Sequence, residues 1–499
     1  MNNFCYIPAS NEEVEYMYKF IGIKDKKELF NKIIGGIPLV NEKDLDFMPD
    51  QMDELSLYKY FSNINDNLRD SGNIPIFAGG GIYDHYVPSA VDAIMSRAEF
   101  YTPYTPYQPE VSQGTLMALF EFQSMTASIL GMDVVNASMY DGAESLAEAV
   151  LMSSRIYRQN RQNDSSKSNN KKIKIIVSKA VNPYYIEVVK TFIEDLDIFI
   201  EFADIDLIKG NTDINDLTEK LAKNKNINQK NANKSDSKSS GDNVSGGEVC
   251  AFIVQQPNYF GIIEDLETIE KIVHNKNCNT SLNPHLIVCS AEPFSFGTIA
   301  PPGFYNADIF AGEGNGFGNY MNFGGPLLGL FAAKKEFIRQ MPGRITGKSK
   351  DNKNKDAYLF ILATREQHIR RQAATSNICT NNSLNALRAA VYLSLCSKQG
   401  FKKISLLNLK LAHILCEKLL NTSLFSLKFT ADFYNEFVLE INNKSINSSK
   451  FINEMLKEGI LAGIPVKNGS SNEVLIAATE KVGIEDIDKY VESSVKILT

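Results

Sequence analysis

The sequence contains seven cysteines, but no two of them form a C-x-x-C pair. An odd number of cysteines without paired spacing argues against a disulfide framework and against a zinc site, so we expect mostly buried, reduced thiols and no metal. The sequence also lacks an apolar run of about 18 residues, and its amino terminus has neither a basic segment nor the apolar segment of a secretory signal. These absences predict a cytoplasmic protein that does not span a membrane.

The sequence also lacks an excess of positive charge. The chain has 52 lysines and arginines against 59 aspartates and glutamates, a formal net charge of −7. Nucleic acids and anionic membrane surfaces favour basic stripes, so we expect neither of them as a partner. With 499 residues, 43% of them hydrophobic, the chain can bury a large core and is long enough for two or three domains.

Lysine is absent between Asn277 and Ala333. This gap includes a glycine-rich segment at residues 312–318 and the turn Gly324-Gly325-Pro326. Glycines allow a backbone to approach a ligand, but they also satisfy turns that need positive φ, and the second explanation is the simpler one. In either case the segment has no amine with which to hold a ligand covalently.

Helical and strand-like patterns predict the organisation of the chain. Residues 1–70 contain short helical patterns at 12–21, 26–35 and 53–64, which indicate a helical amino-terminal arm. Residues 71–333 begin with helices at 113–130 and 142–155 and continue with β-branched runs at 173–177, 198–202, 250–254 and 286–289. Short apolar runs separated by helices predict a doubly wound α/β domain with a parallel sheet.

Two tracts at 158–172 and 224–248 are rich in Asn, Lys and Ser, and 348–356 is a shorter case. Such tracts bury little apolar surface, so we interpret them as solvated insertions. Residues 334–499 predict a long helical region at 359–399, an alternating strand at 436–441 with one polar face, a strand at 474–478 and a closing helix at 484–498. This pattern indicates a connecting helix and a smaller α+β domain.

A segment at residues 101–114 interleaves hydroxyl side chains with three prolines, which restrict the backbone and favour extended geometry before them. Pre-set hydroxyls suit the binding of a small polar substrate, although a proline-stiffened connector with packed tyrosines explains the same pattern. The candidate lining residues in and beside it are Tyr101, Thr102, Tyr104, Thr105, Tyr107, Gln108, Glu110, Ser112 and Gln113.

Two further motifs allow a structural and a functional interpretation. Gly79-Gly80-Gly81 precedes His85, which is a candidate lining residue but taken alone fits a structural histidine better than a base. Asp141, Gly142 and Glu144 begin a predicted helix whose amino terminus could attract an anion. The two acids can occupy that position themselves, so we expect this pocket to hold phosphate poorly.

Six segments of the chain are similar to a known family. They are FAGGGIYDHYVPS (77–89), YTPYTPYQPEVSQG (101–114), ASMYDGAE (137–144), QPNYFGIIED (256–265), FGGP (323–326) and REQHIRRQAATSNICT (365–380). Together they resemble the first-subunit family of two-chain glycine dehydrogenase (decarboxylating), the P-protein of the glycine cleavage system. The similar segments are long, contain unusual strings and extend over most of residues 4–490.

This resemblance implies a pyridoxal-phosphate transferase of fold type I, an α/β architecture, and a second subunit whose lysine carries the pyridoxal phosphate. Related catalytic chains have a His-Lys pair near the position of Asn315-Gly316, so the lysine gap agrees with a degenerate cofactor pocket. The implied partners are this lysine-bearing subunit, in a heterotetramer, and the lipoyl H-protein. Residues that the resemblance places near the partner's cofactor are Thr375, Ser376 and Asn377.

In the implied reaction glycine is decarboxylated on the partner's cofactor, and its aminomethyl group passes to the lipoyl group of H-protein. This chain would shape the site, with the segment at 101–114 at its border. Two alternatives remain at this stage. One is a self-sufficient pyridoxal-phosphate enzyme using Lys334 or Lys335, and the other is a non-catalytic scaffold that docks the lipoyl carrier.

Overall fold

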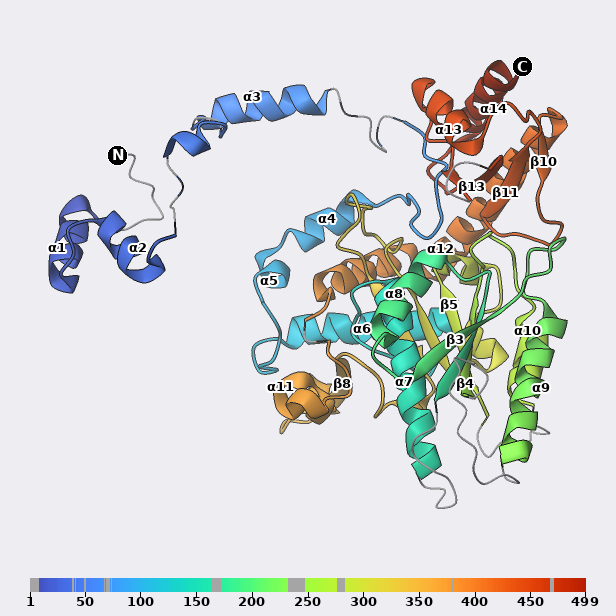
Figure 1. The fold of residues 1–499 in the computed structure, drawn as a ribbon, viewed down its shortest axis with the longest axis horizontal. Helices are drawn as coiled ribbons and strands as arrows, with labels where there is room; N and C mark the ends of the chain where they lie inside the picture. The colour runs from blue at the N-terminus through green and yellow to red at the C-terminus, as the bar shows by residue number, and fades with distance from the viewer. Residues whose placement is uncertain are drawn as a thin grey trace. The chain divides into compact units, whose positions relative to one another are not determined.

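The computed structural model describes residues 9–37, 40, 42–48, 51–66, 68, 72, 74–162, 172–231, 247–275, 283–378, 380–466 and 471–499 (Figure 1). The chain divides into two compact units, residues 1–69 and 70–499. Within the described ranges, no helix is long and apolar enough to cross a membrane. The same ranges contain no group of three or more His, Cys, Asp or Glu side chains suited to a metal ion. Cys250, Cys289 and Cys416 are buried free thiols.

The amino-terminal unit contains the three predicted helices, α1 (Asn11–Ile21), α2 (Lys26–Ile34) and α3 (Glu54–Asn65), and a short 3₁₀ turn at Glu42–Leu45. Side chains cap the helix starts, as at α1, where Ser10 and Glu13 form a reciprocal capping box. None of the three helices has a buried residue within this unit. The described part of this unit therefore consists of capped helices, and its role as an arm stays a prediction.

The second unit is built on a seven-stranded sheet with the order β1-β7-β6-β5-β4-β2-β3. Strands β2 to β6 are parallel where they pair, whereas β7 is antiparallel to both of its neighbours. The four predicted strands are present as β2, β3, β4 and β5. The strand bounds are β1 (Val134–Val135), β2 (Ile173–Ser178), β3 (Ile198–Ala203), β4 (Glu248–Gln255), β5 (His285–Ser290), β6 (Ile309–Glu313) and β7 (Gly329–Ala333).

Helices cover both faces of this sheet, as in a doubly wound fold. One apolar cluster packs α7 (Gly142–Gln162) and α8 (Pro183–Ile193) against one face. The other cluster packs α6 (Gln113–Leu130), α9 (Ile214–Asn231), α10 (Leu266–Val273) and the first part of α12 (Ser383–Asn421) against the opposite face. Helix α6 has the predicted bounds and ends at Gly131 in the left-handed conformation.

A smaller sheet with the order β10-β11-β13-β12 forms the carboxy-terminal part, as expected for an α+β domain. Its elements are β10 (Phe425–Leu427), β11 (Glu436–Ile441), α13 (Ser448–Lys457), β12 (Ile464–Pro465), β13 (Glu473–Ala477) and α14 (Ile484–Leu498). Helix α12 joins the two sheets and is interrupted at Ser397, which has a φ of 55°.

Four sequence predictions need correction. The expected insertion at 348–356 is a hairpin of β8 (Ile345–Lys350) and β9 (Asp356–Ile361), in which Lys348 and Lys350 pair with Asp356. The long helix expected at 359–399 begins only at Ser383. The two long Asn-rich insertions are shorter than expected, because α7 and α9 continue into them; residues 163–171 and 232–246 lie outside the described ranges. Strand β11 is buried at Glu436, the position expected on a polar face.

Candidate functional site

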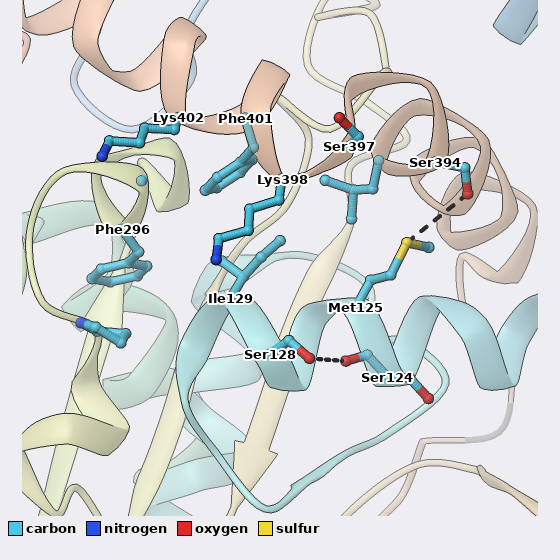
Figure 2. A pocket seen from close by; sticks show the side chains of 13 residues that line it. Ser124, Met125, Ser128, Ile129, Phe296, Ser394, Ser397, Lys398, Phe401 and Lys402 are labelled. Carbon is cyan, nitrogen blue, oxygen red and sulfur yellow. Dashed lines mark hydrogen bonds between the residues drawn. The ribbon is translucent and has the colours of Figure 1, made fainter.

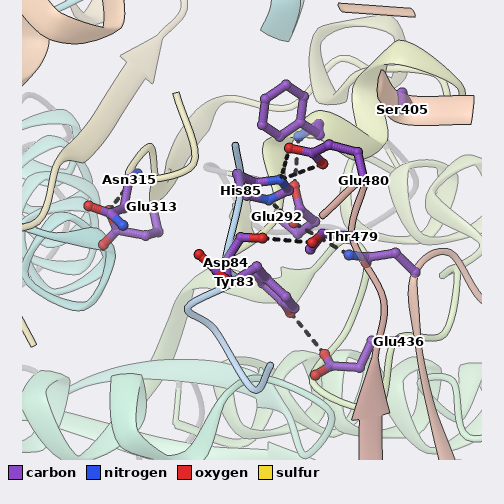
Figure 3. Close-up of polar contacts among 12 residues, drawn as sticks. Tyr83, Asp84, His85, Glu292, Glu313, Asn315, Ser405, Glu436, Thr479 and Glu480 are labelled. Atoms are coloured by element: carbon purple, nitrogen blue, oxygen red, sulfur yellow. Dashed lines mark hydrogen bonds and ion pairs between the residues drawn. The ribbon is translucent and has the colours of Figure 1, made fainter. Parts of the chain in front are cut away.

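Ligands of doubly wound folds bind at the carboxyl ends of the parallel strands. In this chain β5 ends at Ser290 and leads to Glu292, β6 ends at Glu313, and α7 begins beside them at Gly142. Asn315 and Gly316, where the family resemblance expects a degenerate cofactor site, follow β6 directly. Figure 3 shows Glu313, Asn315 and Glu292 in this region.

Glu313 closes the amino terminus of α7. Its carboxylate accepts hydrogen bonds from the backbone N–H groups of Gly142 (3.0 Å), Asn315 (2.9 Å) and Leu328 (3.0 Å), and the residue is 3% exposed. Burial raises the pKa of Glu313 to about 8 despite these donors. The helix end that could attract a phosphate is thus already capped by a carboxyl group.

Two more acids lie at the same helix end. Asp141 accepts a hydrogen bond from the backbone N–H of Glu144 at 2.7 Å, as the sequence led us to expect. Burial, with Glu148 and Asp141 nearby, raises the pKa of Glu144 to about 8. A dianionic phosphate placed here would meet acidic side chains instead of free amides, so this helix end is poorly suited to the phosphate of pyridoxal phosphate.

His85 lies buried among acidic side chains, also at the carboxyl ends of the parallel strands. Its Nε2 is 2.9 Å from Glu292 Oε2, its Nδ1 is 3.0 Å from Glu480 Oε2, and its side chain is 2% exposed (Figure 3). Burial lowers the pKa of His85, but the carboxylates of Glu480 and Glu292 outweigh burial and raise it well above its ordinary value. Both ring nitrogens have partners within the chain, as in a structural histidine.

The space left between these residues is about 10 Å³, lined among others by His85, Glu292, Glu313, Asn315 and Gly316. A cavity of this size holds at most a water molecule. The Asn315 side chain is 2% exposed, and its amide has no hydrogen-bond partner within the described part of the chain. This chain's own residues therefore do not fit pyridoxal phosphate, because volume, phosphate site and lysine are all missing from the strand ends.

Lys334 and Lys335 lie at the opposite end of the strands, beside the amino end of β6. Lys334 follows β7, and its Nζ is 2.6 Å from Oδ1 of Asp308, the residue that precedes β6. Because β7 is antiparallel to β6, this pair marks the amino end of the parallel strands. Ligands of this fold bind at the other end, so neither lysine is placed to hold a cofactor there.

Replacing Lys334 by methionine is expected to affect stability alone. Asp308 would keep His274 as a partner but lose one charged hydrogen bond, which costs about 1–3 kcal/mol. Urea unfolding measures this change, and Lys335→Met is the matched control because Lys335 is exposed and has no ion pair among the described residues. A borohydride-reducible pyridoxal adduct on Lys334 in the isolated chain would contradict this assignment.

The segment at 101–114 lies on the surface, where some side chains are anchored and others are free. Tyr107 accepts a hydrogen bond from Arg344 at 2.7 Å, and Gln113 exchanges hydrogen bonds of 2.9 Å with the backbone of Tyr358 in β9. Thr102 donates to the carbonyl of Ala98. Tyr101 and Tyr104 are 56% and 83% exposed. Of the remaining candidates, Gln108 and Glu110 are exposed, and Thr105 and Ser112 are half-buried.

The candidates at 375–377 lie close to α7 of the same chain. The hydroxyl of Ser376 donates to Glu148 at 2.6 Å, whereas Asn377 is exposed and Thr375 is half-buried. Burial raises the pKa of Glu148, and Ser376 partly offsets that effect. The structure thus separates the candidates into three places: the buried strand ends, the exposed tyrosine segment and the loop beside α7.

A second, larger cavity of about 750 Å³ lies between α6, α12 and the segment after β5 (Figure 2). Its lining is mostly apolar, with Met125, Ile129, Phe296 and Phe401 beside the exposed Lys398 and Lys402. Among the described residues that line it there is no carboxylate, histidine or cysteine, so they offer no partner for the ring nitrogen of a pyridoxal cofactor. We therefore place the candidate site at the carboxyl ends of the strands, although the cavity beside His85 is far smaller than the one between α6 and α12.

Sequence reasoning missed four acids of the buried network: Glu292, Glu313, Glu436 and Glu480. Glu436 accepts hydrogen bonds from the Tyr83 hydroxyl (2.9 Å) and the Gly80 N–H (2.6 Å). A signal existed for Glu313, which ends an apolar run between two glycines, and for Glu292, which follows a predicted strand. None existed for Glu480, whose partners are distant in the sequence.

Comparisons with known proteins agree with this architecture. The family model for the glycine cleavage system P-protein matches residues 4–493. A probable glycine dehydrogenase (decarboxylating) subunit 1 from Chloroherpeton thalassium is 37% identical over 489 residues, covering 98% of each chain. The corresponding protein of Carboxydothermus hydrogenoformans is 37% identical over 490 residues and is likewise covered to 98%.

Solved structures show the same fold. A crystal structure of glycine decarboxylase (P-protein) of the glycine cleavage system, in inhibitor-bound form, superposes with a TM-score of 0.79 at 30% identity and covers 99% of this chain and 100% of that one. Lactobacillus brevis glutamate decarboxylase, at 12% identity with a TM-score of 0.62, covers 93% and 95% and shows the fold alone. The architecture is thus that of fold-type-I pyridoxal-phosphate enzymes, and the chain belongs to the glycine cleavage system P-protein family.

Proposed function

We propose that this chain is the lysine-free subunit of a two-chain glycine decarboxylase, in which it forms part of an active site whose pyridoxal phosphate is held by a lysine of the partner subunit. In that site glycine loses CO2, and its aminomethyl group passes to the lipoyl group of H-protein. Pyridoxal phosphate supplies the electron sink for this chemistry when it is bound. The assembly we propose is a heterotetramer of two lysine-free and two lysine-bearing subunits.

The observation that carries this proposal is the contrast between the buried strand ends and the exposed tyrosine segment. At the strand ends, Glu313 caps α7 and His85 is enclosed by two glutamates, which leaves no room for a cofactor. At the surface, Tyr101 and Tyr104 are exposed, and their hydroxyl groups have no hydrogen-bond partner among the residues that the structure describes. Exposed hydroxyl groups on a backbone segment anchored at Thr102, Tyr107 and Gln113 suit a site completed by a second subunit.

Reconstitution with a lysine-bearing P-protein subunit tests this proposal. Purified alone, the chain is expected to lack the long-wavelength absorbance of a pyridoxal Schiff base and to show no exchange of the glycine carboxyl group with bicarbonate. Co-expressed with the partner and supplied with lipoylated H-protein, it is expected to restore that exchange. A complex that assembles but does not exceed the activity of the partner alone would instead support a docking role.

A further inference from the structure

The segment that contains His85 lies between the large and the small domain and is bonded to both. Toward the small domain, the Phe77 N–H donates to the Leu461 carbonyl at 2.7 Å, and the Ala477 N–H donates to the Phe77 carbonyl at 2.8 Å. Toward the large domain, the Asn182 side chain donates to the Gly80 carbonyl at 3.0 Å. We call residues 76–86 the interdomain strap.

His85 connects the same two domains through one ring. Glu292 follows β5 of the large sheet, and Glu480 follows β13 of the small sheet. Each carboxylate is oriented by a backbone group as well, because Glu292 accepts from the Phe294 N–H (3.1 Å) and Glu480 accepts from the Tyr86 N–H (2.9 Å). A charged imidazole between two oriented carboxylates gives two charge-assisted hydrogen bonds, one to each domain.

The ring of His85 lies at the carboxyl end of β5, the end of the strands at which ligands of this fold bind. Pyridoxal enzymes place an acidic side chain against the protonated ring nitrogen of the cofactor. Here the acid at the end of β5, Glu292, is bonded to a ring nitrogen of His85, and the Phe294 ring centre lies 4.7 Å from the imidazole centre. A Cβ at Gly316 would lie 2.7 Å from Cδ2 of His85. The imidazole and a side chain at position 316 therefore compete for one space.

We propose that the charged ring of His85 replaces a cofactor ring in this chain and fastens the small domain to the large domain, so that this subunit keeps one fixed domain arrangement without a cofactor. This inference rests on contacts within the chain and does not depend on the proposed function.

The contacts of His85 with Glu292 and Glu480 have a definite pH dependence. The pKa of His85 is raised in the folded chain, so its contribution is complete below the ordinary pKa of histidine and is lost as the pH rises through the folded value. Glu480 behaves in the opposite sense. Burial raises its pKa, but His85 lowers that pKa by more, so the net pKa is lowered and the contribution of Glu480 to stability is lost toward acid pH. The other titratable groups near His85 are Tyr83 and Asp84 within the strap, and Tyr392, Glu436 and Lys481 beside it.

Hydrogen exchange of the full chain tests this inference on His85→Gln. Peptides that cover the strap and residues 477–480 are expected to exchange at least about 10-fold faster than in the wild type, while β4 keeps its protection. The protection factors of the wild-type strap should also fall as the pH rises above neutrality. In His85→Gln this pH step should be absent, which a merely structural role of the side chain does not predict.

His274 provides a matched control. It is also held between two acids, Glu270 at 3.0 Å and Asp308 at 2.8 Å, but all three belong to the large domain. His274→Gln should change exchange near α10 and leave the strap protected. If His85→Gln does not fold, Glu480→Gln removes the charge while keeping the bond to Glu292, and we expect the same local acceleration. Unchanged strap protection, or acceleration spread equally over β4, would overturn the inference.

Discussion

Glu313→Ala is expected to lower the free energy of unfolding by about 3–5 kcal/mol, among the largest losses for a single substitution in this chain. The reason is the number of donors that depend on one carboxyl group: the N–H groups of Gly142, Asn315 and Leu328 all lose their acceptor. These N–H groups lie at the buried end of β6. Water cannot reach them to replace the Glu313 side chain unless the structure opens at the ends of the strands. Urea unfolding at neutral pH measures the loss through a lower midpoint.

Two variants test whether the lost hydrogen bonds cause this loss of stability. Glu313→Gln keeps a carbonyl oxygen for two of the three donors, so its loss should lie between those of the wild type and the alanine variant. Glu144→Ala removes another acid at the same helix end, but among the described residues this acid accepts one longer bond, 3.4 Å from the Tyr140 N–H. We expect a change of less than about 1 kcal/mol there. Equal losses for Glu313→Ala and Glu144→Ala would show that Glu313 is not the main cap of α7.

Local patterns predicted the helices well, because their signals lie within a few residues. Helix α6 was expected at 113–130 and α14 at 484–498, and both have these bounds. Residues 348–356 are exposed, as expected of a solvated tract, but the hairpin of β8 and β9 was missed because its strands pair with each other and pack on α6, which composition does not indicate. Tertiary pairing decided this structure, and composition alone did not reveal it.

The candidate site shows the same division between local and distant information. The acids at 141 and 144 were expected to occupy the start of α7, since helix-end chemistry is local. The third acid, Glu313, comes from a strand more than 160 residues away, and the bond that joins it to Gly142 could not be inferred from spacing. Likewise, His85 gave no sign of its partners at positions 292 and 480. The expectation of positive-φ turns is confirmed at Gly318, Gly324 and Gly325, whose φ values are 79°, 108° and 143°, whereas the glycines at 312, 314 and 316 allow close packing without positive φ.

Tyr104→Ala is expected to lower the turnover of the reconstituted complex about 10- to 100-fold without dissociating it. The segment is held at Thr102, Tyr107 and Gln113, so the Tyr104 side chain projects from a stiff backbone instead of moving freely. It is 83% exposed and its hydroxyl has no partner within the described chain, so its removal costs this subunit little stability. Glycine–bicarbonate exchange measures the turnover, and size-exclusion chromatography measures assembly.

Tyr184 is the matched control, since it is 66% exposed on α8 and lies outside the tyrosine segment. Tyr184→Ala should leave both turnover and assembly unchanged. Tyr104→Phe then distinguishes the two parts of the side chain, because a loss as large as that of alanine assigns the effect to the hydroxyl, and a small loss assigns it to the ring. If Tyr104→Ala keeps full turnover in an intact complex, the exposed tyrosines do not line the shared site, and the contribution of this subunit must come from another surface.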